Sequence, residues 1–217
     1  ALTHSRTHVP RTPVPPVDRI ARQLHFAAEL DRLKGILRRT RLIDGSRREN
    51  TAEHSWHIAM LGVVMAEHAP AEIDLARVLS ILLVHDVVEI EAGDTFGFDT
   101  AGYLDKEARE RAAASLLFGL LPAEQGDELR ALWEEFEAGE TAEARFAVAM
   151  DRLQPLLQNF HGGGGSWREH GITRAQVLRR MDPIREGAPA LWPTVLEMID
   201  RACAAGHILP DPAVPAG

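Results

Sequence analysis

One stretch of the chain combines an apolar helix with side chains that bind metals or move protons. The segment is Leu82–Thr95, LLVHDVVEIEAGDT. The four apolar residues 81–84 are followed directly by His85 and Asp86, and Glu89 lies one helical turn further along. A charged aspartate in an apolar helix is costly unless the carboxylate is paired or binds a cation. Glu89 follows His85 by four residues and Asp86 by three, so the three groups share one side of a helix. These residue types at this spacing indicate a metal site or an acid–base site.

A single His–Asp pair is more often a cap or a core hydrogen bond, so the interpretation depends on partners elsewhere. The segment ENTAEHSWH places His54 in the first turn of an expected helix. The segment RFAVAMDRLQPLLQNF places Asp151 at the edge of an apolar stripe, although Asp151 and Arg152 would also suit a surface pair. Together the segments supply two imidazoles and two carboxylates: His54, His85, Asp86 and Asp151. Such mixed ligands suit Mn, Fe, Co, Ni or Zn and leave positions for water and substrate.

The order of these residues and the segments around them resemble the HD-domain metal-dependent phosphohydrolases. RRENTAEHSWHIAM, LLVHDVVEIEAGDT and MDRLQPLLQNF are similar to the 5′-deoxynucleotidase-like branch of that family, and the resemblance covers residues 24–201. It implies an all-α fold, hydrolysis of a phosphomonoester and four metal ligands: His54, His85, Asp86 and Asp151. No histidine lies between His85 and His161, so the additional histidine of dinuclear HD proteins is missing. We therefore expect one divalent metal ion, with Mn, Co, Fe, Ni, Zn and Mg all open.

The same resemblance implies roles for three further residues. Glu89 and Asp94 match the acidic residues that act as acid and base in the 5′-deoxynucleotidase branch, with the two roles unassigned. Arg39 aligns with the arginine that binds the phosphate, although several neighbouring arginines would also suit a solvated basic surface. A bulky aromatic residue follows this arginine in the bacterial enzymes, whereas Thr40 stands here. This difference leaves the preference for deoxyribose open.

The activity implied is hydrolysis of (deoxy)nucleoside 5′-monophosphates to nucleoside and phosphate, with a small-molecule nucleotide as the substrate. Two alternatives stay open: an HD hydrolase acting on another small phosphoester or on a nucleoside triphosphate, and a non-catalytic nucleotide-binding module. Because Glu89 and Asp94 are both present, nothing in the sequence indicates a degenerate site.

The elements that position these residues are expected to be helices throughout. Helical spacing of apolar residues predicts helices over about residues 17–37, 51–68, 73–91, 103–120, 123–139, 141–160, 173–186 and 189–205. Asn50 and Glu53 form an expected capping box, and Pro155 is an expected kink. Residues 38–50 and 161–171 read as polar loops, and no stretch alternates with period two long enough to predict a strand. The predicted fold is a single all-α HD-domain bundle of about eight helices.

The domain prediction follows the same pattern. Residues 1–17 are rich in proline and polar side chains, lack the apolar core of a signal peptide, and are expected to form a flexible arm. Residues 18–206 are assigned to the HD domain and 207–217 to a C-terminal tail.

Composition limits the expected partners. A formal net charge of −8 disfavours polymeric nucleic acid, which needs clustered Lys and Arg. One cysteine excludes an intramolecular disulfide and fits a reducing, cytoplasmic location. No apolar run reaches the roughly 18 residues of a membrane span. The resemblance suggests a homodimer, with an apolar face on the late helices as either interface or core: Leu191, Trp192, Leu196 and Ile199.

Overall fold

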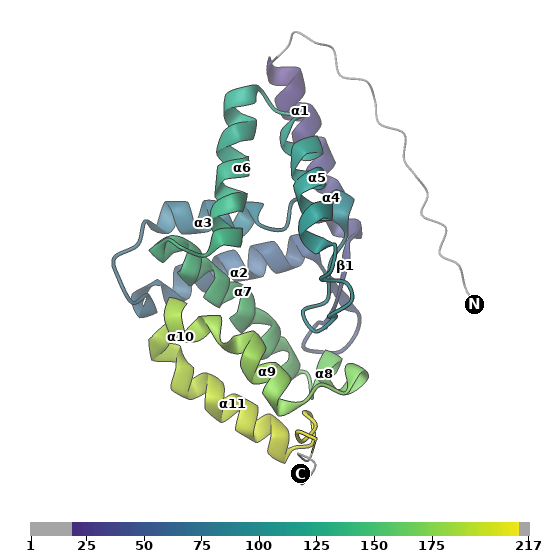
Figure 1. Cartoon of the computed structure of the whole chain (residues 1–217), viewed down its shortest axis with the longest axis vertical. Helices are drawn as coiled ribbons and strands as arrows, with labels where there is room; N and C mark the ends of the chain where they lie inside the picture. The colour runs from purple at the N-terminus through teal and green to yellow at the C-terminus, as the bar shows by residue number, and fades with distance from the viewer. Residues whose placement is uncertain (1–18, 213–217) are drawn as a thin grey trace, which may run out of the picture.

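The computed structural model describes residues 19–212, which fold into helices and one small hairpin (Figure 1). The predicted arm at residues 1–17 and the last part of the predicted tail, residues 213–217, lie outside the described residues. Within residues 19–212, eight α-helices have seven residues or more, which confirms the predicted all-α fold of about eight helices.

The helices and strands have these bounds. The α-helices are α1 (Arg19–Glu29), α2 (Thr51–Met65), α3 (Leu75–Val84), α4 (Glu89–Ala92), α5 (Lys106–Phe118), α6 (Ala123–Ala138), α7 (Ala142–His161), α8 (Gly165–His170), α9 (Arg174–Met181), α10 (Pro183–Gly187) and α11 (Trp192–Ala204). The 3-10 helices are η1 (Leu30–Gly35), η2 (Ala66–His68) and η3 (Pro189–Leu191), and the strands are β1 (Leu37–Arg41) and β2 (Arg48–Asn50).

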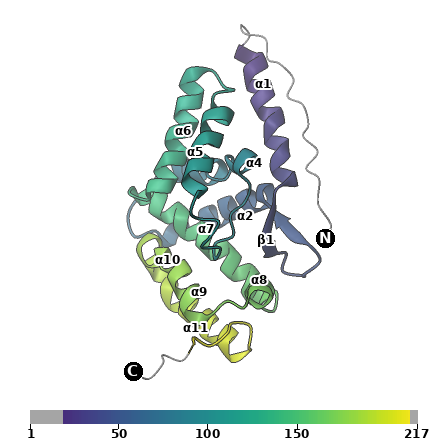
Figure 2. The same cartoon turned by 45° about the vertical axis from the view of Figure 1, so that its right-hand side comes forward.

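Helix α7 runs through the middle of the molecule and joins its two halves. In Figures 1 and 2, α1, α5 and α6 stand at one end, α8 to α11 gather at the other, and α2 and α3 cross between them. One apolar core joins α2, α3 and α7 to the late helices, and a second lies among α1, η1, α4, α5 and α6. Side chains of α7 such as Phe146 and Met150 are fully buried in the first core. Helix α7 therefore carries Asp151 into the most protected part of the fold.

The start of α2 follows the predicted capping box. The Asn50 side chain accepts a hydrogen bond from the Glu53 backbone N–H at 3.0 Å, and the Glu53 carboxylate accepts one from the Asn50 N–H at 3.1 Å. This reciprocal pair satisfies two of the free N–H groups at the helix start. It also fixes the orientation of the first turn, where His54 lies.

The predicted helix over residues 73–91 is wrong as one continuous element. Helix α3 ends at Val84, residues 85–88 form turns, and α4 begins at Glu89. Bonds between residues three apart, such as Glu89 N–H to the Asp86 carbonyl at 3.0 Å, tighten this stretch. Helical spacing in the sequence did not reveal the break because three-residue and four-residue turns have similar periods.

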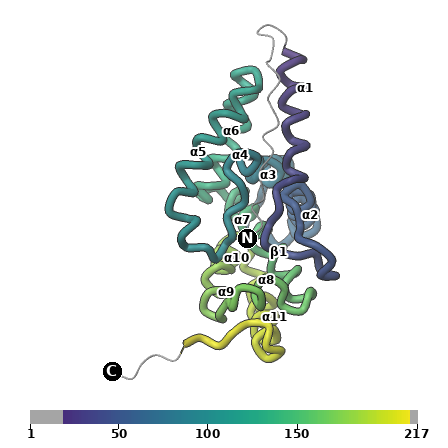
Figure 3. Tube along the Cα trace, turned by 90° about the vertical axis from the view of Figure 1, so that its right-hand side faces the viewer, coloured from purple at the N-terminus to yellow at the C-terminus, as the bar shows by residue number. Residues whose placement is uncertain are grey.

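The predicted polar loop at residues 38–50 is also wrong, because it contains the antiparallel pair of β1 and β2. The hairpin lies beside α2 in Figure 3. Strands of five and three residues are too short for period-two alternation to be visible in a polar sequence. In β1 the side chains of Arg38 and Thr40 point inward, whereas Arg39 is exposed.

The predicted loop over residues 161–171 contains α8. The Asn159 side chain accepts hydrogen bonds from Ser166 Oγ at 3.0 Å and from the Trp167 N–H at 3.3 Å, which pins the start of this helix. Trp167 is almost fully buried in the first core. Packing against α7 therefore orders a glycine-rich segment that the sequence predicted to be a loop.

The apolar face of the late helices is core. Ile199 is fully buried, and Leu191 and Trp192 pack against the first core. On α2, in contrast, four apolar side chains are exposed: Trp56, Met60, Val63 and Val64. In the described part of the chain no helix is both long and apolar enough to cross a membrane.

Candidate metal centre and its cavity

The four predicted metal ligands converge where α2, the turn after α3 and α7 meet. His54 Nε2 lies 2.9 Å from Asp151 Oδ1, and His85 Nε2 lies 3.8 Å from the same oxygen. Asp86 Oδ2 lies 3.1 Å from His85 Nε2 and 3.7 Å from His54 Nε2. Ligand atoms of His54, His85 and Asp151 all lie within 4.8 Å of one another. Packing thus brings together side chains separated by up to 97 residues in the chain.

The two imidazoles are oriented so that their Nε2 atoms face the carboxylates. His85 Nδ1 is 2.8 Å from the Leu82 carbonyl oxygen, and His54 Nδ1 is 3.0 Å from Gln154 Oε1. An acceptor at Nδ1 places the proton there and leaves Nε2 with a free lone pair. The buried Nε2 of His85 has no well-directed hydrogen-bond partner among residues 19–212. This donor set fits a divalent cation.

The charges of the cluster support the same interpretation. Burial opposes a proton on His85, but Asp86 and Asp151 outweigh burial and raise the pKa of His85 to about 10. Burial and the nearby Arg38 lower the pKa of His54 to about 4. Without a metal, therefore, a proton on His85 offsets the charge of the two carboxylates. Metal ions displace such protons from their ligands.

A buried polar network behind His54 was not predicted from the sequence. The Gln154 amide donates to Glu49 Oε1 at 2.7 Å, while its own oxygen faces His54 Nδ1. Gln158 also donates to Glu49 Oε1, at 2.6 Å. Glu49 is 1 % exposed, and burial raises its pKa to about 7 although Arg38 lowers it. The network holds the imidazole of His54 in one orientation and one tautomer.

Replacing Gln154 by leucine is expected to weaken metal binding about 10- to 100-fold, because His54 loses the partner that orients it. Competition with a chromophoric chelator measures this affinity. The matched control is Gln158→Leu, which removes the other donor to Glu49 but no contact with His54. A loss of the same size in both variants would show that Gln154 acts only by supporting Glu49.

Arg38 contacts the carboxylate cluster, whereas the predicted phosphate-binding residue, Arg39, does not. Arg38 Nη1 lies 3.0 Å from Asp86 Oδ2 and 3.9 Å from Asp94 Oδ1, and its side chain is 12 % exposed. Arg39 is exposed and lines a smaller neighbouring cavity together with Asp94. Both arginines line the smaller cavity, but only Arg38 also lines the larger one. Recognition of the strand would have added Arg38 as a candidate beside Arg39.

The predicted acid–base residues line the same cavity as the candidate metal ligands. Glu89 is 5 % exposed, and its carboxylate accepts a hydrogen bond from Thr51 Oγ1 at 2.8 Å. Burial, with the charge of Asp86, raises the pKa of Glu89 well above its usual value. Burial likewise raises the pKa of Asp94, although Arg38 opposes this shift. Both shifts favour the protonated form of the carboxyl group, which suits a residue that transfers protons.

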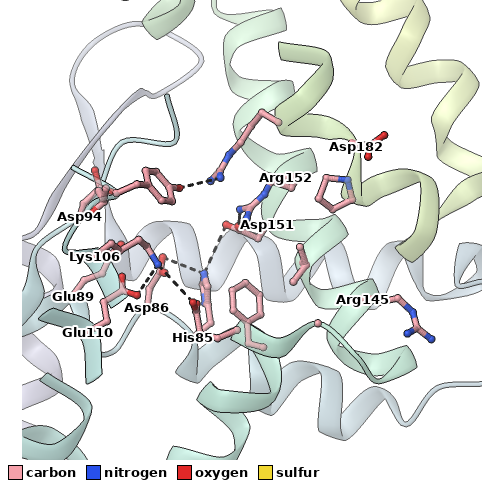
Figure 4. Close-up of a pocket in the computed structure, with 18 of the residues that line it drawn as sticks. His85, Asp86, Glu89, Asp94, Lys106, Glu110, Arg145, Asp151, Arg152 and Asp182 are labelled. Carbon is pink, nitrogen blue, oxygen red and sulfur yellow. Dashed lines mark hydrogen bonds and ion pairs between the residues drawn. The ribbon is translucent and has the colours of Figure 1, made fainter. Parts of the chain in front are cut away.

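The cavity has a volume of about 410 Å³, which suits a small-molecule ligand. His85, Asp86, Glu89, Asp94 and Asp151 lie along one side of it (Figure 4). Its lining also contains five cationic side chains: Arg38, Lys106, Arg145, Arg152 and Arg180. A cavity that combines candidate metal ligands with several cationic side chains is typical of a site that binds phosphorylated compounds.

A family model named "HD domain" matches residues 30–192. The chain belongs to the HD-domain family. The match includes every residue of the cluster and most of the cavity, so the predicted family is confirmed.

Several relatives of this HD-domain protein have been named for their activity. The chain is 32 % identical over 110 residues to the 5′-deoxynucleotidase HDDC2 of Bos taurus and 31 % identical over 112 residues to that of Homo sapiens. These matches cover 51 % and 52 % of this chain. The chain spans about half the length of these curated relatives, 52 % and 53 % respectively.

A solved structure covers much more of the HD domain. The crystal structure of a "predicted metal-dependent phosphohydrolase" from Magnetospirillum magnetotacticum MS-1 is 52 % identical, with a TM-score of 0.84, and the match covers 88 % of this chain and 99 % of that one. The PH0347 protein from Pyrococcus horikoshii OT3 is 20 % identical with a TM-score of 0.60 over 82 % of this chain and 98 % of that one, and shares the fold. The chain is thus an HD-domain protein with a buried His/His/Asp metal-site candidate.

Proposed function

We propose that this HD phosphohydrolase is a metal-dependent phosphomonoesterase that hydrolyses (deoxy)nucleoside 5′-monophosphates to nucleoside and phosphate. The observation that carries the proposal is the convergence of two imidazoles and two carboxylates beside Glu89 and Asp94, on a cavity of small-molecule size. The 5′-deoxynucleotidases among the relatives support the choice of substrate.

One divalent ion would be held by the four residues of the cluster: His54, His85, Asp86 and Asp151. When bound, such an ion polarises the phosphoryl group and makes a water molecule more acidic. The chain itself supplies the orientation of both imidazoles and excludes bulk water from them, since His54 is fully buried and His85 nearly so.

Glu89 and Asp94 divide the two proton transfers. One carboxylate takes a proton from the attacking water as its oxygen bonds to phosphorus. The other, in its protonated form, gives a proton to the 5′-oxygen as the P–O bond breaks. The raised pKa of both groups supports this division, because it favours the protonated form that the proton donor needs.

Two arginines are candidates for the phosphate-binding role that was predicted for Arg39: Arg38 and Arg39 itself. We expect Arg38→Lys to lower kcat/KM by about 10- to 100-fold, because a lysine loses the directed contacts of a guanidinium to oxyanions. We expect Arg39→Lys to change kcat/KM less than threefold, a small effect for an exposed charge. Steady-state kinetics on one nucleotide measures both. The reverse order of effects would restore Arg39 as the phosphate ligand.

A matrix of metals and substrates tests the proposed function. The protein is loaded in turn with Mn, Co, Mg, Zn or Fe and assayed for phosphate release from deoxy- and ribonucleoside monophosphates. Triphosphates and other phosphoesters are tested as additional substrates. Turnover of at least one monophosphate, dependent on metal, is expected. A protein that binds metal stoichiometrically and releases no phosphate from any nucleotide would contradict the proposal.

The homodimer and the cytoplasmic location stay predictions. The exposed apolar side chains of α2 are the face that we propose for self-association, in place of the late helices. Light scattering of the full-length protein measures its mass in solution.

A further inference from the structure

Arg180, on α9, lies where the large cavity meets the smaller one of about 50 Å³. Three arginines line both cavities: Arg38, Arg152 and Arg180. Arg38 contacts Asp86, and Arg152 contacts Asp151. Within residues 19–212, no carboxylate lies within 4.0 Å of the Arg180 guanidinium, whose hydrogen-bond partner is the Tyr103 hydroxyl at 3.1 Å.

The guanidinium of Arg180 is held in place by the loop that carries Asp94. A Cβ atom on Gly97 would lie 2.7 Å from Arg180 Nε and 3.0 Å from Nη2, so the absence of a side chain lets the loop backbone cover this edge of the guanidinium. Tyr103, further along the same segment, accepts the hydrogen bond from Nη1. A cation that is positioned before the ligand arrives loses less entropy on binding.

Among the described residues Arg180 forms no ion pair, and the charge of Asp151 favours its positive form without a direct contact. Burial, together with the charge of Arg152, lowers the pKa of Arg180 below its usual value, yet a guanidinium stays charged at neutral pH. Asp151 is shared between Arg152 and the imidazole cluster. Lys106, another cation of the large cavity, is matched by Glu110 at 2.6 Å.

Arg145 is the other cation of this cavity without a carboxylate partner among the described residues. It donates to the Glu140 carbonyl at 2.6 Å and lies apart from the carboxylate cluster in Figure 4. Arg180 is therefore the cation that combines a fixed position, the lack of an ion-pair partner within 4.0 Å among residues 19–212, and a place in the lining of both cavities.

We propose that Arg180, with Arg152 beside it, binds a phosphate group of the substrate. A guanidinium offers two parallel N–H donors to a phosphate, and a phosphate dianion supplies the missing counter-charge. The phosphate is either the one that is hydrolysed or a second one on the same nucleotide, since both present the same oxyanion chemistry. This inference rests on the proposed function for the identity of the substrate, but not for the binding of phosphate itself.

Calorimetric titration of the full-length protein with inorganic phosphate at low ionic strength tests the proposal. Arg180→Met is expected to weaken phosphate binding about 10- to 100-fold, the effect of losing a charge-assisted contact. Arg180→Lys is expected to recover part of the loss, because it restores the charge. Arg179→Met is the matched control: it changes the neighbouring residue of the same helix, which is exposed and lines neither cavity.

Tyr103→Phe separates phosphate binding from a structural role. It removes the hydrogen bond that positions Arg180 but keeps the positive charge, so phosphate binding is expected to weaken by less than in Arg180→Met. Unchanged phosphate binding in Arg180→Met, or an equal loss in Tyr103→Phe, would overturn the proposal.

Two nucleotides then distinguish the sources of the phosphate. If Arg180→Met raises KM equally for deoxyadenosine 5′-monophosphate and for the 3′,5′-bisphosphate, Arg180 binds the phosphate that is hydrolysed. If only the bisphosphate is affected, Arg180 binds a second phosphate. A protein that binds inorganic phosphate through Arg180 but hydrolyses no nucleotide would contradict the proposed function and leave this inference intact.

Discussion

Asp151→Asn is expected to abolish both stoichiometric metal binding and phosphatase activity. Asp151 is 6 % exposed, and its Oδ1 faces the Nε2 atoms of His54 at 2.9 Å and His85 at 3.8 Å. Asparagine keeps the shape but removes the negative charge that favours a cation between the two imidazoles. Because a metal ion contributes several kcal/mol to such a reaction, we expect kcat/KM to fall by about 10³-fold or more.

Metal content by atomic emission and phosphate release from a nucleotide measure the two effects in the same preparation. Asp182→Asn is the matched control, since Asp182 also lines the cavity but is exposed and pairs with Arg185 at 3.3 Å. Circular dichroism shows whether the fold is kept, which separates a lost ligand from a lost core. A variant that keeps one metal per chain and full activity would exclude Asp151 from the metal site.

Glu89→Gln is expected to lower kcat by about 10²- to 10⁴-fold, the usual contribution of a general acid or base. Glutamine retains an oxygen that can accept the hydrogen bond from Thr51, so the side chain keeps its position. Metal content is expected to stay the same, because Glu89 is not one of the four proposed ligands: His54, His85, Asp86 and Asp151. A fall in kcat without loss of metal separates proton transfer from metal binding.

The control for Glu89→Gln is Glu110→Gln. Glu110 is buried, lines the same cavity, and pairs with Lys106 rather than facing the cluster. Both substitutions replace a buried carboxyl group that lines the cavity, so a general electrostatic effect would lower the rate in both. If Glu89→Gln leaves the rate unchanged, Glu89 has no catalytic role, and a contaminating phosphatase must be sought in the preparation.

The convergence of the four candidate metal ligands was predictable because each lies in a segment with its own local signal. His54 follows a capping box that the structure confirms, and the His85–Asp86 pair interrupts an apolar run. Asp151 borders the buried stripe of α7. Helical periodicity and caps act over a few residues, so the sequence shows them directly. Their order along the chain then resembled that of the HD domain.

The phosphate-binding role of Arg39 stays a prediction, and the choice between Arg39 and Arg38 shows how far local signals reach. Arg38 and Arg39 are adjacent, and the sequence offers no physical reason to prefer one of them. Only the tertiary structure places Arg38 against Asp86, whereas Arg39 is exposed and lines the smaller cavity. A hairpin this short is stabilised by its contacts with the rest of the fold, not by its own sequence pattern.

The sequence by itself determined most of the helical elements, the types of the candidate metal ligands and the family. Only the tertiary structure showed which further polar residues lie around the candidate site: Arg38, Glu49, Gln154 and Arg180. The contact between Glu49 and Gln154 joins segments that lie 105 residues apart in the chain. Such contacts depend on the burial of the polar groups and on which opposite charges lie near them. Spacing within one helix follows from backbone geometry, whereas such contacts arise only when separate helices pack and exclude water from the groups between them.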